Sequence, residues 1–97
     1  MSRQEIVNSL QRHLPELRAL FGVRELLLFG SLARNETAET SDVDLVVEFE
    51  GPADFDRYMG VRFFLEDRLG VKVDLVTSKA LRPSLRQAIE QEAIHVA

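Results

Sequence analysis

Residues 29–34 read FGSLAR and residues 41–45 read SDVDL, and these two stretches decide the fold. The first ends a short apolar run at 25–29, and the second opens another at 43–49. Short apolar runs bounded by glycine or polar residues are typical of buried strands. The polar segment NETAETS at 35–41 separates the two runs and predicts a surface loop.

Helical spacing appears on both sides of this centre. Near the N-terminus, apolar residues recur at intervals of three or four, at Ile6, Leu10, Leu14, Leu17 and Phe21. We expect this helix to kink or restart at Pro15 and to stop at Gly22. A second helix is predicted over 54–69. Its stripe consists of Tyr58, Val61, Leu65 and Leu69, widened by Phe55, Met59 and Phe63. We expect Tyr58, Phe63 and Phe64 to be core.

The remaining elements complete an alternating pattern. Residues 71–76 predict a third strand, and residues 94–96 a short edge strand. A last helix is expected from Ser84, where Ser84-x-x-Gln87 has the form of a capping box. Its expected buried side chains are Leu85, Ala88, Ile89 and Ala93. The order predicts a single α/β (α+β) domain over 1–97, with helices mainly on one face of the sheet.

Composition excludes several classes of protein. The 97 residues carry a net charge of −4, whereas general nucleic-acid binders usually show a basic surface. There is no cysteine, so disulfides and thiolate chemistry are excluded. No apolar run approaches the roughly 20 residues of a membrane span, and the N-terminus lacks a signal core. We therefore expect a cytoplasmic protein that binds neither membranes nor nucleic acid directly.

Three aspartates are candidates for metal ligands. Asp42 and Asp44 lie two residues apart, so on a strand they share one face at roughly 6–7 Å. Asp74 interrupts an apolar strand pattern that has no structural need for an acid. Carboxylate oxygens suit Mg²⁺, and three such groups can hold two ions about 3.5–4 Å apart for phosphoryl or nucleotidyl transfer.

The FGSLAR stretch offers groups that bind phosphate. Gly30 lets a phosphate approach the backbone, and Ser31 adds a hydroxyl at the start of a helical turn. Arg34, one turn on, can reach the same phosphates with its forked guanidinium. Taken singly, an Asp-x-Asp pair, a Gly-Ser turn and an exposed arginine are ordinary surface features. Their combination in this order and spacing favours a nucleotide site.

These motifs resemble the signature of the DNA polymerase β-like nucleotidyltransferase superfamily, in particular its single-domain minimal nucleotidyltransferases (MNT). The resemblance covers nearly the whole chain. It implies a small mixed sheet with helices on one side, and two Mg²⁺ ions held by Asp42, Asp44 and Asp74. It also implies that Gly30 and Ser31 hold the triphosphate and that Asp74 acts as base toward an acceptor hydroxyl. Asn35 departs from the glycine found in many relatives, which affects the loop and not the metal ligands.

The resemblance also implies a partner. Proteins of this kind are often antitoxins that transfer AMP from ATP to a tyrosine of an all-helical HEPN toxin. Larger relatives carry a further helical domain for the acceptor, and this chain has none, so we expect a homo- or hetero-oligomer. Three alternatives remain: a contact-only antitoxin with a vestigial nucleotide site, a small-molecule (aminoglycoside-type) adenylyltransferase, and a domain with an incidental acidic cluster.

Overall fold

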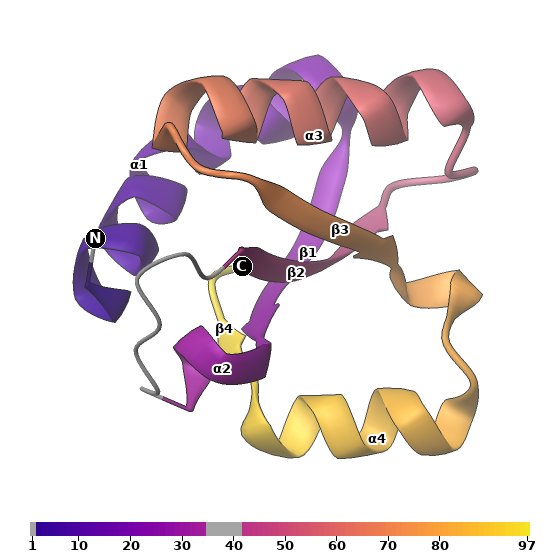
Figure 1. Ribbon diagram of the computed structural model, residues 1–97. Helices are drawn as coiled ribbons and strands as arrows, with labels where there is room; N and C mark the ends of the chain where they lie inside the picture. The colour runs from indigo at the N-terminus through magenta and orange to yellow at the C-terminus, as the bar shows by residue number, and fades with distance from the viewer. Residues whose placement is uncertain (1, 35–41) are drawn as a thin grey trace.

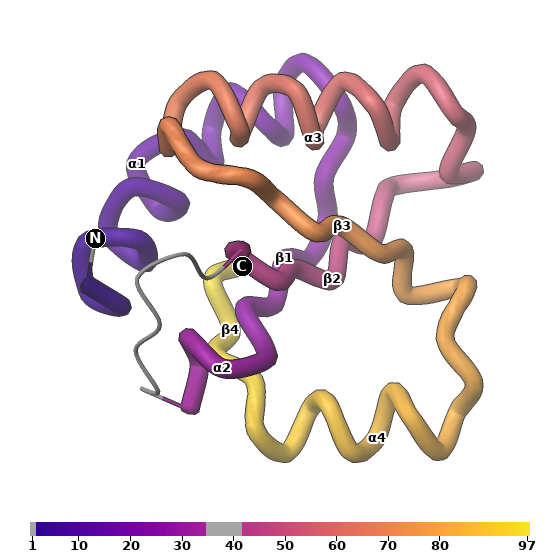
Figure 2. Tube along the Cα trace, viewed as in Figure 1, coloured from indigo at the N-terminus to yellow at the C-terminus, as the bar shows by residue number. Residues whose placement is uncertain are grey.

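One mixed sheet organises the molecule in the computed structural model, which describes residues 2–34 and 42–97 (Figure 1). Within those residues its strands are β1 (Val23–Phe29), β2 (Val43–Phe49), β3 (Val73–Thr77) and β4 (Ile94–His95). Their order across the sheet is β3-β2-β1-β4. β1 runs antiparallel to both β2 and β4, whereas β3 runs parallel to β2. Figure 2 shows β4 returning beside β1 after the chain has passed through the other elements.

The long helices divide between the two sides of this sheet. α1 (Arg3–Phe21) and α3 (Phe55–Leu69) pack together over one face. α4 (Pro83–Glu92) lies on the opposite side, with the short α2 (Gly30–Ala33) between it and the end of β1 (Figure 1). A 3₁₀ turn, η1 (Ser78–Ala80), connects β3 to α4. The expected class, a small mixed β-sheet packed with helices, is confirmed; the two longest helices share one face, and α4 lies on the other.

The core fills the space between the sheet and the α1–α3 pair. Its fully buried side chains are Ile6, Leu10, Leu17, Leu26, Leu28, Val43, Leu45, Val47, Val61, Leu65 and Val73. Side chains alternate along a strand, so the residues between these point to the other face. On β2 that face receives Asp44, Val46 and Glu48. We call this face, which α2 and α4 cover only in part, the open face of the sheet, and it carries the acids.

α1 is a single helix, and the expected restart at Pro15 does not occur. Ser2 caps its first turn in a capping box with Glu5, and the helix ends at Gly22 as predicted. Leu14 is buried directly beside the proline. Because buried side chains continue on both sides of it, tertiary packing offsets the lost backbone hydrogen bond.

The helix predicted over 54–69 is α3, and Asp54 caps it by accepting a hydrogen bond from the Arg57 N–H. The expectation that Tyr58, Phe63 and Phe64 are core is wrong for Phe63, and Phe55 is exposed as well. Phe55 is 69% exposed and Phe63 is 60% exposed. Phe63 lies two residues after buried Val61, so it points about 200° around the helix from it.

α4 differs most from the prediction. It begins at Pro83, not Ser84, and its N-terminus has no side-chain cap. Proline suits the first helical position because its missing N–H would have no partner there. No residue of α4 is fully buried, and Leu85 is 51% exposed, so the expected burial of its apolar side chains is wrong. The predicted loop at 35–41 lies outside the described residues.

No helix in the described part of the chain is both long enough and apolar enough to cross a membrane.

Candidate nucleotide and metal site

The parallel pairing of β2 with β3 brings two of the predicted acids together. Asp44 and Asp74 are direct register partners across these strands. Asp44 is also the register partner of Phe29, the last residue of β1, so Gly30 follows at the same end of the sheet. Asp42 immediately precedes β2. Residues from three separate parts of the sequence therefore meet on the open face.

Gly30 lies directly against Asp44 because it has no side chain. Its φ of 76° lies in the left-handed region that favours glycine. A Cβ atom added to Gly30 would collide with the Asp44 carboxylate. The turn from β1 into α2 can therefore lie against Asp44 only because residue 30 is glycine.

Burial and the neighbouring acids disfavour the charged form of Asp44 in the folded chain. Burial raises the pKa of Asp44, and the neighbouring charges of Asp74 and Asp42 and a hydrogen bond with Asp74 raise it further. Arg34 opposes this effect by its positive charge. A carboxylate pair of this kind binds either a proton or a cation, and the all-oxygen donor set suits a hard cation such as Mg²⁺.

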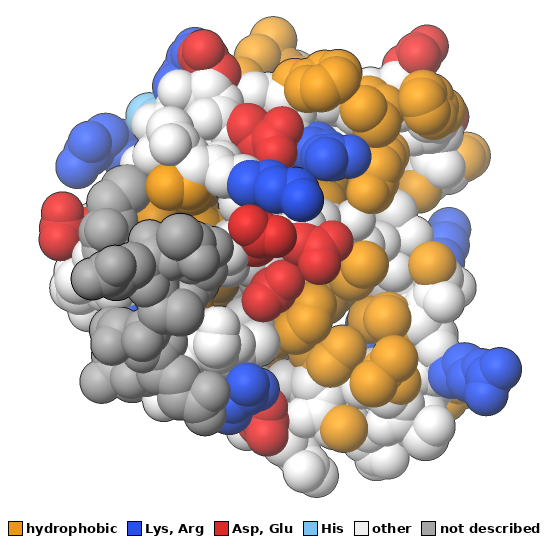
Figure 3. Space-filling model, viewed as in Figure 1, with side chains coloured by type: hydrophobic (Ala, Val, Ile, Leu, Met, Phe, Trp, Pro, Cys, Tyr) orange, Lys and Arg blue, Asp and Glu red, His pale blue; other side chains and the backbone are white. Residues whose placement is uncertain are grey.

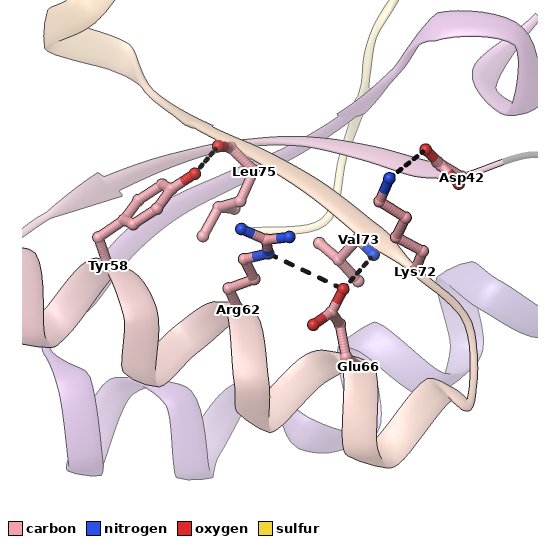
Figure 4. A network of polar contacts seen from close by, with 7 residues as sticks. All are labelled: Asp42, Tyr58, Arg62, Glu66, Lys72, Val73 and Leu75. Atoms are coloured by element: carbon pink, nitrogen blue, oxygen red, sulfur yellow. Dashed lines mark hydrogen bonds and ion pairs between the residues drawn. The ribbon is translucent and has the colours of Figure 1, made fainter.

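Lys72 is a neighbour of the acids that sequence reasoning did not identify. Its Nζ lies 3.9 Å from Asp42 Oδ2 (Figure 4), and both side chains are substantially exposed. The Lys72 carbonyl accepts a hydrogen bond from the Val43 N–H at 3.0 Å, which fixes the start of β3 against β2. The sequence indicated this neighbour only by placing a lysine two residues before Asp74.

Asp42 is the acid that the structure does not bring into the pair. Across residues 2–34 and 42–97, no three carboxylate or imidazole side chains converge as a ready-made metal site. An exposed ion pair such as Asp42–Lys72 contributes only about 0–1 kcal/mol. A divalent cation beside Asp44 would therefore compete with Lys72 for the Asp42 carboxylate, whereas Asp44 and Asp74 already supply adjacent oxygen donors of the kind that Mg²⁺ takes.

The predicted phosphate-binding residues lie beside the acids. Ser31 is the second residue of α2, and Arg34 follows that helix with its Nη1 3.3 Å from Glu92 Oε2 of α4. A groove of about 270 Å³ runs between α2 and α4. Its walls are Phe29, Gly30, Arg34, Leu85, Ala88, Ile89 and Glu92. Figure 3 shows acidic side chains gathered near the middle of this face, with basic side chains beside them and apolar side chains toward α4.

Comparison with known families agrees with this geometry. The chain matches the Nucleotidyltransferase domain over residues 10–96. It belongs to that family. The match includes every predicted site residue, from Gly30 to Asp74. This nucleotidyltransferase is therefore an enzyme, and its acids and Gly-Ser turn lie within the family's own domain.

Relatives of this nucleotidyltransferase cover nearly its full length. It is 38% identical to the protein adenylyltransferase MntA of Thermococcus cleftensis over 96 residues, covering 99% of this chain and 97% of the relative. A solved structure of a proposed minimal nucleotidyltransferase is 35% identical, with a TM-score of 0.82 over 97% of this chain and 95% of that one.

A second solved structure shares the fold at lower identity. It holds a tri-AMPylated HEPN toxin of Shewanella oneidensis in complex with an MNT antitoxin. Its TM-score is 0.70 at 20% identity, over 98% of this chain and 71% of that one. The suspected relationship to minimal nucleotidyltransferases is confirmed.

Proposed function

We propose that this nucleotidyltransferase transfers AMP from ATP to a hydroxyl of a partner protein, namely a tyrosine of a HEPN-type toxin, and so acts as an antitoxin. The observation that carries the proposal is the Asp44–Asp74 pair, placed in register on the open face directly against Gly30. The name of the Thermococcus cleftensis relative supports protein adenylylation. The toxin as partner is taken from the complex that shares the fold.

The chain's own residues suit the chemistry of this transfer. Asp42, Asp44 and Asp74 would hold Mg²⁺, which when bound supplies positive charge to the phosphate oxygens. The backbone at Gly30 and the Ser31 hydroxyl would hold the triphosphate, and Arg34 would turn from Glu92 toward it. Because Asp74 is exposed and Asp44 only half-buried, a side chain from another protein can reach them.

The reaction requires the transfer of one proton. The acceptor oxygen forms a bond to the α-phosphorus, and the bond between that phosphorus and the oxygen bridging to the β-phosphate breaks. Pyrophosphate leaves with the electron pair of the broken bond. The proton of the acceptor hydroxyl passes to the Asp74 carboxylate, which is exposed on β3 and so accessible from solvent.

Intact-mass spectrometry tests the proposal. The protein is incubated with ATP, Mg²⁺ and a HEPN-type toxin. We expect the partner to gain the mass of AMP, with the modification mapping to a tyrosine. Asp44→Asn and chelation by EDTA should each abolish the gain. Glu50→Gln is a matched control, because it removes one negative charge from an exposed position just after β2.

The other outcomes separate the alternatives. A stable complex without added mass would replace the transferase proposal by inhibition through contact alone. Transfer to an aminoglycoside but not to the partner would identify a small-molecule adenylyltransferase. AMP transfer that survives in Asp44→Asn would contradict the role given to the acidic pair.

A further inference from the structure

Asp74 lies on the outermost strand at one side of the sheet, because β3 pairs only with β2 among the described strands. An edge strand is held by backbone hydrogen bonds along one side and is free to shift along the other. A metal ligand or proton acceptor must be held within roughly 0.5 Å of its working position. The outer side of β3 therefore matters for the site.

Two side chains of α3 bind this outer side. The Tyr58 hydroxyl donates a hydrogen bond to the Leu75 carbonyl at 2.5 Å. The Val73 N–H donates to Glu66 Oε2 at 3.0 Å. Figure 4 shows Tyr58 and Glu66 reaching β3 from the same helix, two turns apart. Their backbone partners are the residues immediately before and after Asp74.

We propose that Tyr58 and Glu66 are positioning residues that hold the backbone on both sides of Asp74 and so fix its carboxylate beside Asp44. This inference rests on the proposed function, in which Asp74 is a metal ligand and proton acceptor. The helix carrying both side chains belongs to the core, with Val61 and Leu65 fully buried, so they reach β3 from a rigid support. β2 holds the inner side of β3, and α3 holds the outer side.

Arg62 lies between Tyr58 and Glu66 on the same side of α3. Its Nε lies 3.8 Å from Glu66 Oε2 (Figure 4). The same Glu66 oxygen thus accepts from the Val73 N–H and faces a guanidinium. The guanidinium charge adds to the hydrogen bond from Val73 at this carboxylate, and Arg62 Nε itself is buried without a hydrogen-bond partner among the described residues.

The test uses variants that remove one contact at a time. Tyr58→Phe removes only the hydroxyl. Glu66→Leu removes the acceptor, whereas Glu66→Gln keeps an oxygen that can accept from Val73. Asp54→Ala is the matched control, because it removes the N-terminal cap of the same helix, costing about 1 kcal/mol, without touching β3.

Mn²⁺ binding in the presence of a nonhydrolysable ATP analogue provides a readout independent of turnover. We expect the half-saturating Mn²⁺ concentration to rise about tenfold in Tyr58→Phe and Glu66→Leu, the lower end of the range for groups that orient metal ligands. It should stay near the wild-type value in Glu66→Gln and Asp54→Ala. The kcat for AMP transfer should fall in the same two variants, with the KM for the partner unchanged.

Two results would overturn the inference. One is wild-type Mn²⁺ binding in both Tyr58→Phe and Glu66→Leu. The other is an equal shift in Asp54→Ala, which would mean that general loosening of α3 is responsible. Failure of the proposed function gives a different result, in which wild type and Asp74→Asn bind Mn²⁺ equally. Asp74 would then not be a metal ligand, and Tyr58 and Glu66 would have no ligand to position.

Discussion

Substitution of Gly30 by alanine tests the link between the turn after β1 and the acidic pair. A left-handed φ of 76° costs an alanine about 1–2 kcal/mol. Reduced freedom of the unfolded chain offsets about 0.4–1 kcal/mol of this. The new Cβ also collides with the Asp44 carboxylate, and relieving such an overlap costs about 1–3 kcal/mol. We expect Gly30→Ala to lower the free energy of unfolding by about 2–4 kcal/mol.

Gly51 provides a matched control for the backbone part of this cost. It has the same φ of 76°, but an added Cβ there meets no atom within 4 Å. Gly51→Ala should therefore cost only about 1 kcal/mol. Urea unfolding of the metal-free protein, followed by circular dichroism, measures both variants on one scale. The excess cost of Gly30→Ala over Gly51→Ala is then the contact with Asp44.

A double-mutant cycle identifies the source of that excess. In an Asp44→Ala background, the side chain that Gly30→Ala would strike is cut back to its Cβ, so the cost should fall toward that of Gly51→Ala. The reasoning is refuted if Gly30→Ala costs no more than Gly51→Ala in the wild-type background. It is also refuted if the excess persists unchanged without the Asp44 carboxylate.

Three further predictions concern the acids and the core. Asp42→Asn and Asp44→Asn should each abolish nucleotidyl transfer and leave the circular dichroism spectrum unchanged. Ser31→Ala should reduce kcat/KM by less than either acid variant, because it removes one hydrogen bond and no charge. Burial and the Asp74 carboxylate raise the pKa of Asp44 above 3.8, so the folded chain favours the protonated form of this group. Without metal, the wild type should therefore lose stability relative to Asp44→Asn as the pH rises through that raised pKa. The measurement is Tm as a function of pH for both proteins. Leu17→Ala should cost about 2–5 kcal/mol in urea unfolding, because Leu17 is fully buried.

Each of these predictions has an outcome that contradicts it. A larger kinetic loss in Ser31→Ala than in the acid variants would reverse the expected ranking. Parallel curves of Tm against pH for wild type and Asp44→Asn would mean that Asp44 does not titrate abnormally. Leu20 lies on the same helix and is 63% exposed, so an equal cost for Leu20→Ala would show that burial does not set the effect.

The centre of the molecule was predictable because its signals are local. An apolar run that ends at Gly30 and a β-branched run that begins at Val43 give β1 and β2 directly. The structure then places Asp44 on the face of β2 opposite the core. Asp74 was selected because an acid in an apolar strand needs a reason, and its register with Asp44 supplies one.

The last helix and the outer side of β3 could not be predicted from local signals. The spacing of Leu85, Ala88 and Ile89 marks an apolar stripe, but a stripe does not say what covers it, and α4 buries none of them fully. The contacts of Tyr58 and Glu66 with β3 depend on how α3 crosses the strand. Such crossings arise from packing across the whole core, which periodicity does not encode.

The parallel pairing of β2 with β3 also determines when the site can form during synthesis. Asp44 leaves the ribosome well before Asp74, and the two meet only after the intervening α3 has folded back across the sheet. Pairings between distant segments form late because chain closure must precede them. A nascent chain that ends before β3 carries the Gly-Ser turn and two acids but no acidic pair. The Asp44–Asp74 pair therefore forms only once β3 has joined the sheet.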